Sequence, residues 1–167
     1  MSLHYLLDGY NILKQMAAFR DLPLEEGRCG LLRWISNARP QGSMNNQVTV
    51  VFDGHPDQSS MFPVFHAGDS QNTHDIRVIF SDGCSADDQI KLMVDENVQK
   101  KNCVVVSDDK DVFLYARSLG ARVMNVREFI SLRTIARVTL TEGKYISLSH
   151  QEKINKEFFQ RWLGDNQ

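Results

Sequence analysis

The chain has 167 residues, of which 42% are hydrophobic and 24% are charged, values that are ordinary for a soluble globular domain. No apolar run approaches the roughly 20 residues of a membrane-spanning helix. The N-terminus leads directly into a strand, without the features of a signal peptide. Three cysteines without C-x-x-C spacing favour reduced thiols over disulfides. We therefore expect a cytoplasmic protein that does not bind membranes.

The net charge of −2 hides an uneven distribution. Residues 1–109 carry 9 Lys and Arg against 15 Asp and Glu, whereas residues 110–167 carry 10 against 6. An acidic part beside a basic part is compatible with a cation site next to a phosphate-binding flank. It is equally compatible with an ordinary solvated basic surface, and charge alone does not separate the two interpretations.

The first half of the chain alternates between apolar runs and helical patterns. Residues 3–7 are typical of a short buried strand, and a short helix is expected over 12–19. Pro23, followed shortly by two glutamates, starts a second helix that ends before the next proline. A second strand is expected over 47–52. Residues 54–74, rich in Gly, Pro, Ser, Asp and Gln, are expected to form an exposed excursion.

The same alternation continues along the chain. Strands are expected over 75–80, 103–107 and 121–125, and helices over 86–101, 111–119 and 127–132. Ser85 is expected to cap the first of these helices, whose buried stripe consists of Ile90, Met93, Val94 and Val98. Strands and helices that alternate with short connections predict an α/β domain with a parallel, doubly wound sheet over residues 1–132.

Residues 133–167 form a C-terminal extension whose pattern differs from that of the domain. Residues 134–140 alternate and are β-branched, so we expect an extra edge strand or hairpin arm there. Ser149 fits a capping box at the start of a final helix. The extension is expected to pack on the same domain.

Three of the predicted strands run into a carboxylate. Asp8 follows the first strand, Asp53 follows the second, and Asp108 and Asp109 come just after the fourth. Ligands of open α/β sheets bind at the carboxyl ends of the strands. These side chains are therefore expected to line one acidic cleft.

Several of the polar residues also have a purely structural explanation. Asp8 and Asn11 fit a cap of the helix that follows the first strand. Asp87 and Asp88 lie in a predicted first helical turn, where carboxylates interact favourably with the helix dipole. For this second pair, the structural and the catalytic interpretation agree equally well with the sequence.

Clustered carboxylates raise one another's pKa values unless a cation neutralises them. Mg²⁺ and Mn²⁺ fit this role, because they prefer oxygen ligands and bridge to phosphates. Such ions activate water and stabilise the departing oxygen of a phosphodiester. The acids therefore predict metal-dependent phosphodiester hydrolysis, with phosphotransfer as the competing reaction. The chain contains no P-loop, dinucleotide fingerprint or nucleophile elbow, so no nucleotide cofactor is expected.

Four sequence blocks occur in a characteristic order: LDGYN at 7–11, VFDG at 51–54, SADDQI at 85–90 and SDDKD at 107–111. Together they resemble the YacP-like branch of the NYN domains, within the PIN-like nuclease superfamily, over about residues 3–131. The resemblance implies a PIN-like three-layer sandwich with a mainly parallel central sheet flanked by helices. It also implies an acidic site that binds Mg²⁺ or Mn²⁺ and cleaves RNA.

The resemblance implies roles for individual residues as well. The catalytic residues that it implies are Asp8, Asn11, Asp53, Asp87 and Asp109. The metal ligands that it implies are Asp8, Asp53, Asp87, Asp88, Asp109 and Asp111. The alignment of the fourth block is ambiguous by one residue, because Asp108 occupies a position that is often neutral in the family.

The implied function is a metal-dependent endoribonuclease that acts on messenger or ribosome-associated RNA. One alternative is a catalytically quiet module that binds RNA or the ribosome, and another is a structure-specific DNA nuclease. A full set of acids favours the enzyme, since a quiet domain has no reason to tolerate their mutual repulsion.

An acidic cleft repels a polyanion, so we expect RNA affinity to come from a basic rim. The basic C-terminal part of the chain supplies candidates for it. The expected substrate-binding residues are Lys110, Arg133, Arg137 and Lys144, with Tyr145 as a platform on which an unpaired base stacks.

Overall fold

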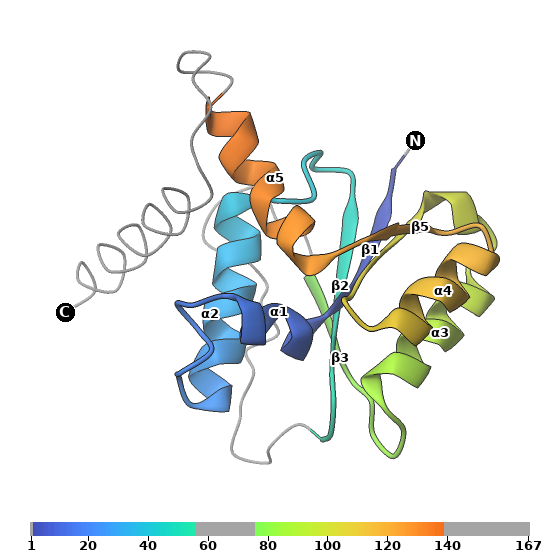
Figure 1. Cartoon of the computed structure of the whole chain (residues 1–167), viewed down its shortest axis with the longest axis horizontal. Coiled ribbons are helices and arrows are strands. Elements are labelled where there is room, and N and C mark those ends of the chain that lie inside the picture. The colour runs from blue at the N-terminus through green and yellow to red at the C-terminus, as the bar shows by residue number, and fades with distance from the viewer. Residues whose placement is uncertain (1, 56–75, 139–167) are drawn as a thin grey trace.

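A five-stranded parallel sheet forms the centre of the computed structural model, which describes residues 2–55 and 76–138, with side chains up to residue 132 (Figure 1). The strands are β1 (His4–Asp8), β2 (Gln47–Phe52), β3 (Ile76–Phe80), β4 (Cys103–Val106) and β5 (Arg122–Met124). The helices are α1 (Gly9–Gln15), α2 (Leu24–Ala38), α3 (Ala86–Glu96), α4 (Lys110–Ser118) and α5 (Val126–Val138), with a 3₁₀ turn, η1 (Lys100–Asn102). This confirms the predicted α/β fold.

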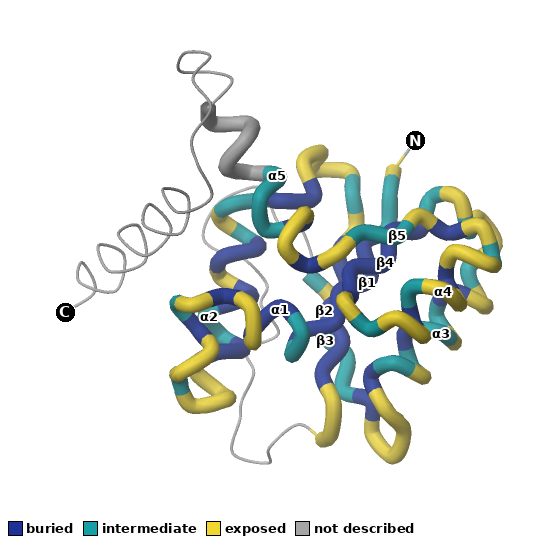
Figure 2. Tube along the Cα trace, in the orientation of Figure 1, coloured by how far each residue is buried: buried dark blue, intermediate teal, exposed yellow. Residues whose placement is uncertain are grey.

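The sheet is covered by helices on both faces. Helices α1, α2 and α5 lie on one face, and α3 and α4 lie on the other (Figure 1). Successive strand residues point to opposite faces, so Leu7 packs in the first core and Leu6 in the second. The central strands are dark blue in Figure 2, because both of their faces are buried. Double-sided burial is the reason why these strands are almost continuously apolar in sequence.

The strand order, β3-β2-β1-β4-β5, places the direction change of the chain between β1 and β4. Strands β2 and β3 are added on one side of β1, and β4 and β5 on the other, with every pairing parallel. At such a switch point the connections leave in opposite directions and open a crevice at the carboxyl ends of the strands. Asp8 ends β1, and Ser107 follows β4, so both lie at this crevice.

Several of the predicted helix boundaries are wrong, including both ends of α1, which ends at Gln15 rather than at residue 19. Helix α1 begins at Gly9 rather than at residue 12, because the Asp8 carboxylate accepts a hydrogen bond from the Asn11 backbone N–H and caps the helix at once. Helix α3 begins after Ser85 as predicted, but it ends at Glu96. Val98 therefore lies outside the helix and is 97% exposed instead of buried. Most of the stability of a helix in a protein comes from packing of its apolar face. The mostly polar residues after Glu96 therefore do not extend α3.

The predicted β segment of the C-terminal extension is also wrong where the structure describes it. Helix α5 continues to Val138, across the predicted domain boundary at 132 and through the first part of the alternating run. Neither Gly nor Pro interrupts 126–138, so an established helix can propagate through β-branched residues. The remaining extension, including the helix predicted after Ser149, lies outside the described residues. None of the described helices combines the length and the apolar character that a membrane span requires.

Candidate active site

Asp8 occupies the switch point and is only 4% exposed. Its Oδ1 accepts the backbone N–H of Asn11 at 3.0 Å, and its Oδ2 accepts the side-chain amide of Asn11. The hydroxyl of Ser107, from the neighbouring strand end, donates to the same Oδ2 at 3.2 Å. Asn11 Nδ2 also lies 3.2 Å from Ser107 Oγ, so the three side chains form one network. Asp8 thus caps α1 and at the same time faces the crevice.

Asp53 links the end of β2 to the start of α3. It is exposed, and its Oδ1 accepts the backbone N–H of Ala86 at 2.6 Å. Ala86 is the first residue of α3, whose N-terminus carries a partial positive charge. This bond brings the first turn of α3, with Asp87, to the carboxyl edge of the sheet.

The Asp87 carboxyl is affected by carboxylates from three other segments of the chain. Burial raises the pKa of the Asp87 carboxyl, and the negative charges of Asp8, Asp109 and Asp53 raise that pKa further, against a smaller opposing effect of Lys91. Among the described residues, none donates a hydrogen bond to the Asp87 carboxylate. We call these four residues, Asp8, Asp53, Asp87 and Asp109, the acidic cluster.

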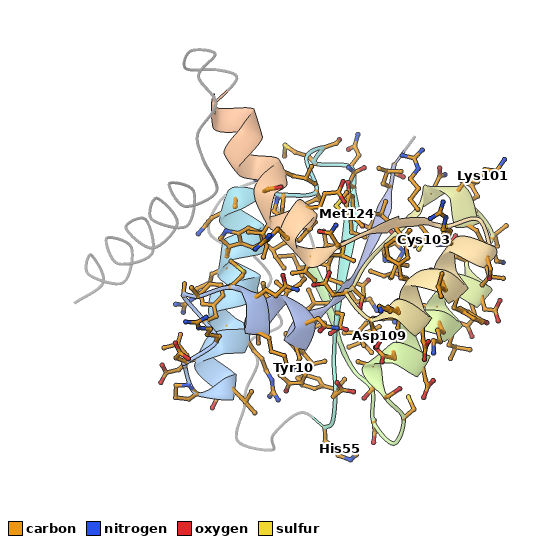
Figure 3. The ribbon with its side chains drawn as sticks, viewed as in Figure 1. Tyr10, His55, Lys101, Cys103, Asp109 and Met124 are labelled. Carbon is orange, nitrogen blue, oxygen red and sulfur yellow. The ribbon has the colours of Figure 1, made fainter. Side chains whose placement is uncertain are left out.

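Asp109 and its neighbour Asp108 differ in their contacts. Asp109 caps α4 by accepting the backbone N–H groups of Asp111 and Val112, and its own N–H donates to Ser107 Oγ at 3.1 Å. Figure 3 shows it near the carboxyl ends of the strands, between the two outer helix layers.

The Asp108 carboxylate is held by two other elements. Its Oδ1 accepts the Val126 N–H at 2.9 Å, at the start of α5, and its Oδ2 accepts the side-chain amide of Gln15 at the end of α1. Of the two residues, only Asp109 acts on the pKa of Asp87.

The other two predicted metal ligands, Asp88 and Asp111, do not affect the pKa of Asp87. Asp88 is exposed, and its Oδ2 accepts a hydrogen bond from the Ser85 hydroxyl, which in turn accepts the Asp88 N–H. Asp111 is exposed in the first turn of α4. Neither carboxylate contributes to the raised pKa of Asp87, so the structure brings together four of the six predicted ligands.

The donor set of the acidic cluster suits a hard divalent cation. Within the described part of the chain, no three His, Cys, Asp or Glu side chains stand close enough to hold a metal ion by themselves. The cluster nevertheless presents only oxygen donors, and the negative charges of three of them oppose ionisation of Asp87. Mg²⁺ usually keeps several of its water ligands, so a hydrated ion needs few direct protein contacts. Asp8, Asp53, Asp87 and Asp109 are the residues that would hold it.

The predicted substrate-binding residues are only partly described. Lys110 is exposed at the start of α4, directly after Asp109. Arg133 and Arg137 belong to α5, but their side chains are not described. Lys144 and Tyr145 lie outside the described residues.

Arg28, which our sequence analysis did not identify, contacts Tyr10 in the helix that follows Asp8. It is 95% buried in α2, and its Nε donates to the hydroxyl of Tyr10 at 3.0 Å, as does its Nη2. Its guanidinium carbon lies 5.4 Å, 5.7 Å and 5.3 Å from the ring centres of Tyr10, Phe52 and Phe80. This cation therefore holds Tyr10, two residues after Asp8. The sequence does contain a signal for the burial of Arg28. Arg28 lies three residues before Leu31, and this spacing places both residues on the buried face of α2.

Comparisons with known proteins identify the family of the chain. The family model described as the YacP-like NYN domain matches residues 5–166. A crystal structure of a point mutant of Rae1 (YacP) from Bacillus subtilis is similar, with a TM-score of 0.60 and 26% identity over 82% of this chain and 78% of that chain. A second crystal structure of Rae1 (YacP) from Bacillus subtilis has a TM-score of 0.57 and 24% identity over 98% and 86%. No curated protein matches the chain. Because the family model spans nearly the whole sequence, the chain belongs to the YacP-like NYN domain family.

Proposed function

We propose that this protein is a divalent-metal-dependent endoribonuclease that hydrolyses phosphodiester bonds in RNA. The observation that carries the proposal is the acidic cluster, in which the carboxylates of Asp8, Asp53 and Asp109, from three separate segments, raise the pKa of Asp87 on α3. Mutual repulsion of this kind costs folding free energy unless a cation offsets it. Membership of the family, which belongs to a nuclease superfamily, supports the same reading of the cluster.

The residues of the cluster have distinct tasks in this reaction. Bound Mg²⁺ or Mn²⁺ would supply an activated water and neutralise charge on the phosphate. Asn11 and Ser107 donate hydrogen bonds to the Asp8 carboxylate. These bonds fix the orientation of the carboxylate, so that it keeps facing the crevice. Lys110 would contact a phosphate beside the cleaved bond, and the basic residues of the extension would contact phosphates further along the RNA.

A cleavage assay tests this proposal. Purified protein is expected to cut a labelled single-stranded RNA in Mg²⁺ or Mn²⁺ and to lose this activity in EDTA. A matched DNA strand and a base-paired RNA serve as competing substrates. Metal-dependent cutting of DNA alone would replace the proposal with a DNA nuclease, and RNA binding without any cutting would replace it with a quiet binding module.

The pair Asp108 and Asp109 gives a second, more local test. Asp109→Asn is expected to lower kcat/KM for RNA more than about 100-fold, which exceeds the usual effect of changing a residue outside the metal shell. Its fold should survive, because Asn also caps helices well. Asp108→Asn is expected to cost much less activity, since that carboxylate is bound to Val126 and Gln15. The reverse ranking in steady-state kinetics, with melting temperatures as the control, would show that Asp108 is the residue that faces the metal.

A further inference from the structure

A cavity of about 360 Å³ lies beside the acidic cluster, on the side of α4. Its volume falls within the range of roughly 300–1,000 Å³ that is common for small-molecule sites. The β4–α4 connection, the first turns of α4 and the residue that precedes α5 form its walls. The residues that line it are Ser107, Asp108, Lys110, Phe113, Leu114 and Asn125.

The cavity and the acidic cluster share a wall. Ser107 lines the cavity, and its hydroxyl donates to Asp8 at 3.2 Å. Lys110, at the cavity, follows Asp109 of the cluster directly in the chain. A nucleotide whose phosphate lies at the cluster would therefore have the neighbouring cavity within reach of its base.

The lining combines an apolar surface with a few polar groups. Phe113 is partly exposed there, and Leu114 is 64% exposed although it is a large apolar side chain. Asn125 Oδ1 accepts the Glu128 N–H at 2.7 Å, which fixes the amide at the start of α5. No described residue accepts a hydrogen bond from Asn125 Nδ2, so its two N–H groups remain available. Single-stranded RNA is recognised by this combination of ring stacking and hydrogen bonding to base edges.

The rim of the cavity carries a cation that can contact the phosphate of a nucleotide. Lys110 contributes an exposed ammonium group at the rim. Among the described residues of the lining, Asp108 is the only acid, and both of its oxygens already accept hydrogen bonds, from Val126 and from Gln15. The positive charge of Lys110 offsets the negative charge of Asp108 at this rim.

We propose that this cavity is a base-binding subsite, in which one unstacked base of the RNA stacks on Phe113 and accepts a hydrogen bond from Asn125 Nδ2. This proposal rests on the proposed function, because the base belongs to the nucleotide beside the bond that the nuclease cleaves. It predicts that cleavage depends on a base at one fixed position relative to the cut.

Single-turnover cleavage of RNAs with one abasic nucleotide at successive positions tests the subsite. In the wild type, one abasic position next to the cut is expected to slow cleavage at least about fivefold, the lower end of the effect of losing one base–aromatic stack. The Phe113→Ala variant is expected to cleave intact RNA slowly. An abasic nucleotide at the same position should not slow its cleavage any further. If the two effects multiply instead, the base does not contact Phe113 and the proposal is overturned.

Two further variants keep this test interpretable. Asn125→Ser retains an oxygen that can cap α5 but removes the amide donor, so it is expected to weaken the abasic effect without abolishing it and without a loss of stability. Leu92→Ala is the control, because it removes a 50% exposed leucine from α3, outside the cavity. A loss of the abasic effect in Leu92→Ala as well would overturn the assignment of the cavity.

A titration with uncharged nucleosides separates the subsite from the nuclease. The Asn125 side-chain amide signal in the NMR spectrum is expected to shift saturably with millimolar nucleoside, but not with ribose, in EDTA. Phe113→Ala should abolish the shift. If the wild type does not cut RNA, the proposed function fails and this titration alone decides on the subsite. If RNA is cut but neither the abasic effect nor the shift occurs, the subsite fails and the nuclease stands.

Discussion

The Asp87→Asn variant is expected to lose RNA cleavage by more than about 100-fold and yet to melt at a higher temperature than the wild type in EDTA. Burial and the charges of Asp8, Asp109 and Asp53 raise the pKa of this carboxyl, so its ionised form is unfavourable in the folded protein. Asparagine keeps the shape and removes the charge. The substitution also removes one favourable contact with the α3 dipole, worth about 0.3–1 kcal/mol, but Asp88 remains in the same turn. Relief of repulsion from three carboxylates therefore outweighs this loss, and the net change in stability on Asp87→Asn is expected to be favourable.

The same carboxyl predicts a pH dependence of stability without metal. Its folded pKa lies above the ordinary value of 3.8, so the folded protein binds this proton more tightly than the unfolded chain. The stabilising contribution is fully present below pH 3.8 and is lost as the pH rises through the folded pKa. Asp87→Asn should remove this loss, which urea unfolding in EDTA at several pH values measures.

Asp95→Asn is the matched control for Asp87→Asn. Asp95 is an exposed acid on the same helix, and its carboxylate accepts the hydroxyl of Tyr115, away from the cluster. Its neutralisation should leave cleavage intact and should not raise the melting temperature. An active Asp87→Asn, or one that is less stable than the wild type in EDTA, would contradict the repulsive cluster.

Gly9→Ala is expected to lower the free energy of unfolding by about 1–3 kcal/mol, the usual cost of overpacking a core. A methyl group at Gly9 would lie 2.3 Å from Cε1 and 2.5 Å from Cδ1 of the Phe52 ring. Phe52 is fully buried, with the rings of Tyr10 and Phe80 at 5.3 Å and 5.9 Å and the Arg28 guanidinium above it, so the ring has no free space to move into. The gain in helix propensity, at most about 1 kcal/mol, is smaller than a clash of this size. Activity should fall as well, because Gly9 follows Asp8.

Gly27→Ala is the control for this prediction. Gly27 also lies in a buried part of a helix, but the nearest atom to an added methyl group is the Phe19 carbonyl oxygen at 3.5 Å, an ordinary contact. This variant should be as stable as the wild type or more stable by up to about 1 kcal/mol. Urea unfolding curves compare the two. In a double-mutant cycle, Phe52→Leu should cancel part of the cost of Gly9→Ala, and strict additivity would contradict the proposed clash.

The sequence alone determined the fold class and the main candidates for the site. Five apolar runs predicted the five strands. The signal is strongest in β1, β2 and β4, because strands buried on both faces must be apolar along almost their whole length. Asp8 and Asp53 stood out because the carboxyl ends of parallel strands share one edge of a sheet. Four ordered blocks predicted the family, which the match over residues 5–166 shows.

Tertiary structure alone decided which of these residues meet. Asp108 and Asp109 are adjacent in the chain, and only the positions of α1 and α5 direct one carboxylate to Val126 and Gln15 and leave the other in the acidic cluster. Arg28 likewise acquires its role from packing against Tyr10, which lies 18 residues earlier.

The cavity beside the cluster depends on the same kind of information. Asn125 reaches it because β5 pairs with β4, which itself pairs with β1. Helix α5 also overrides the β-branched pattern after residue 132, since a helix that has already been nucleated continues at little cost. Local patterns report which face of an element is buried, but the side chains that come together are set by the strand order and by helix packing between distant segments.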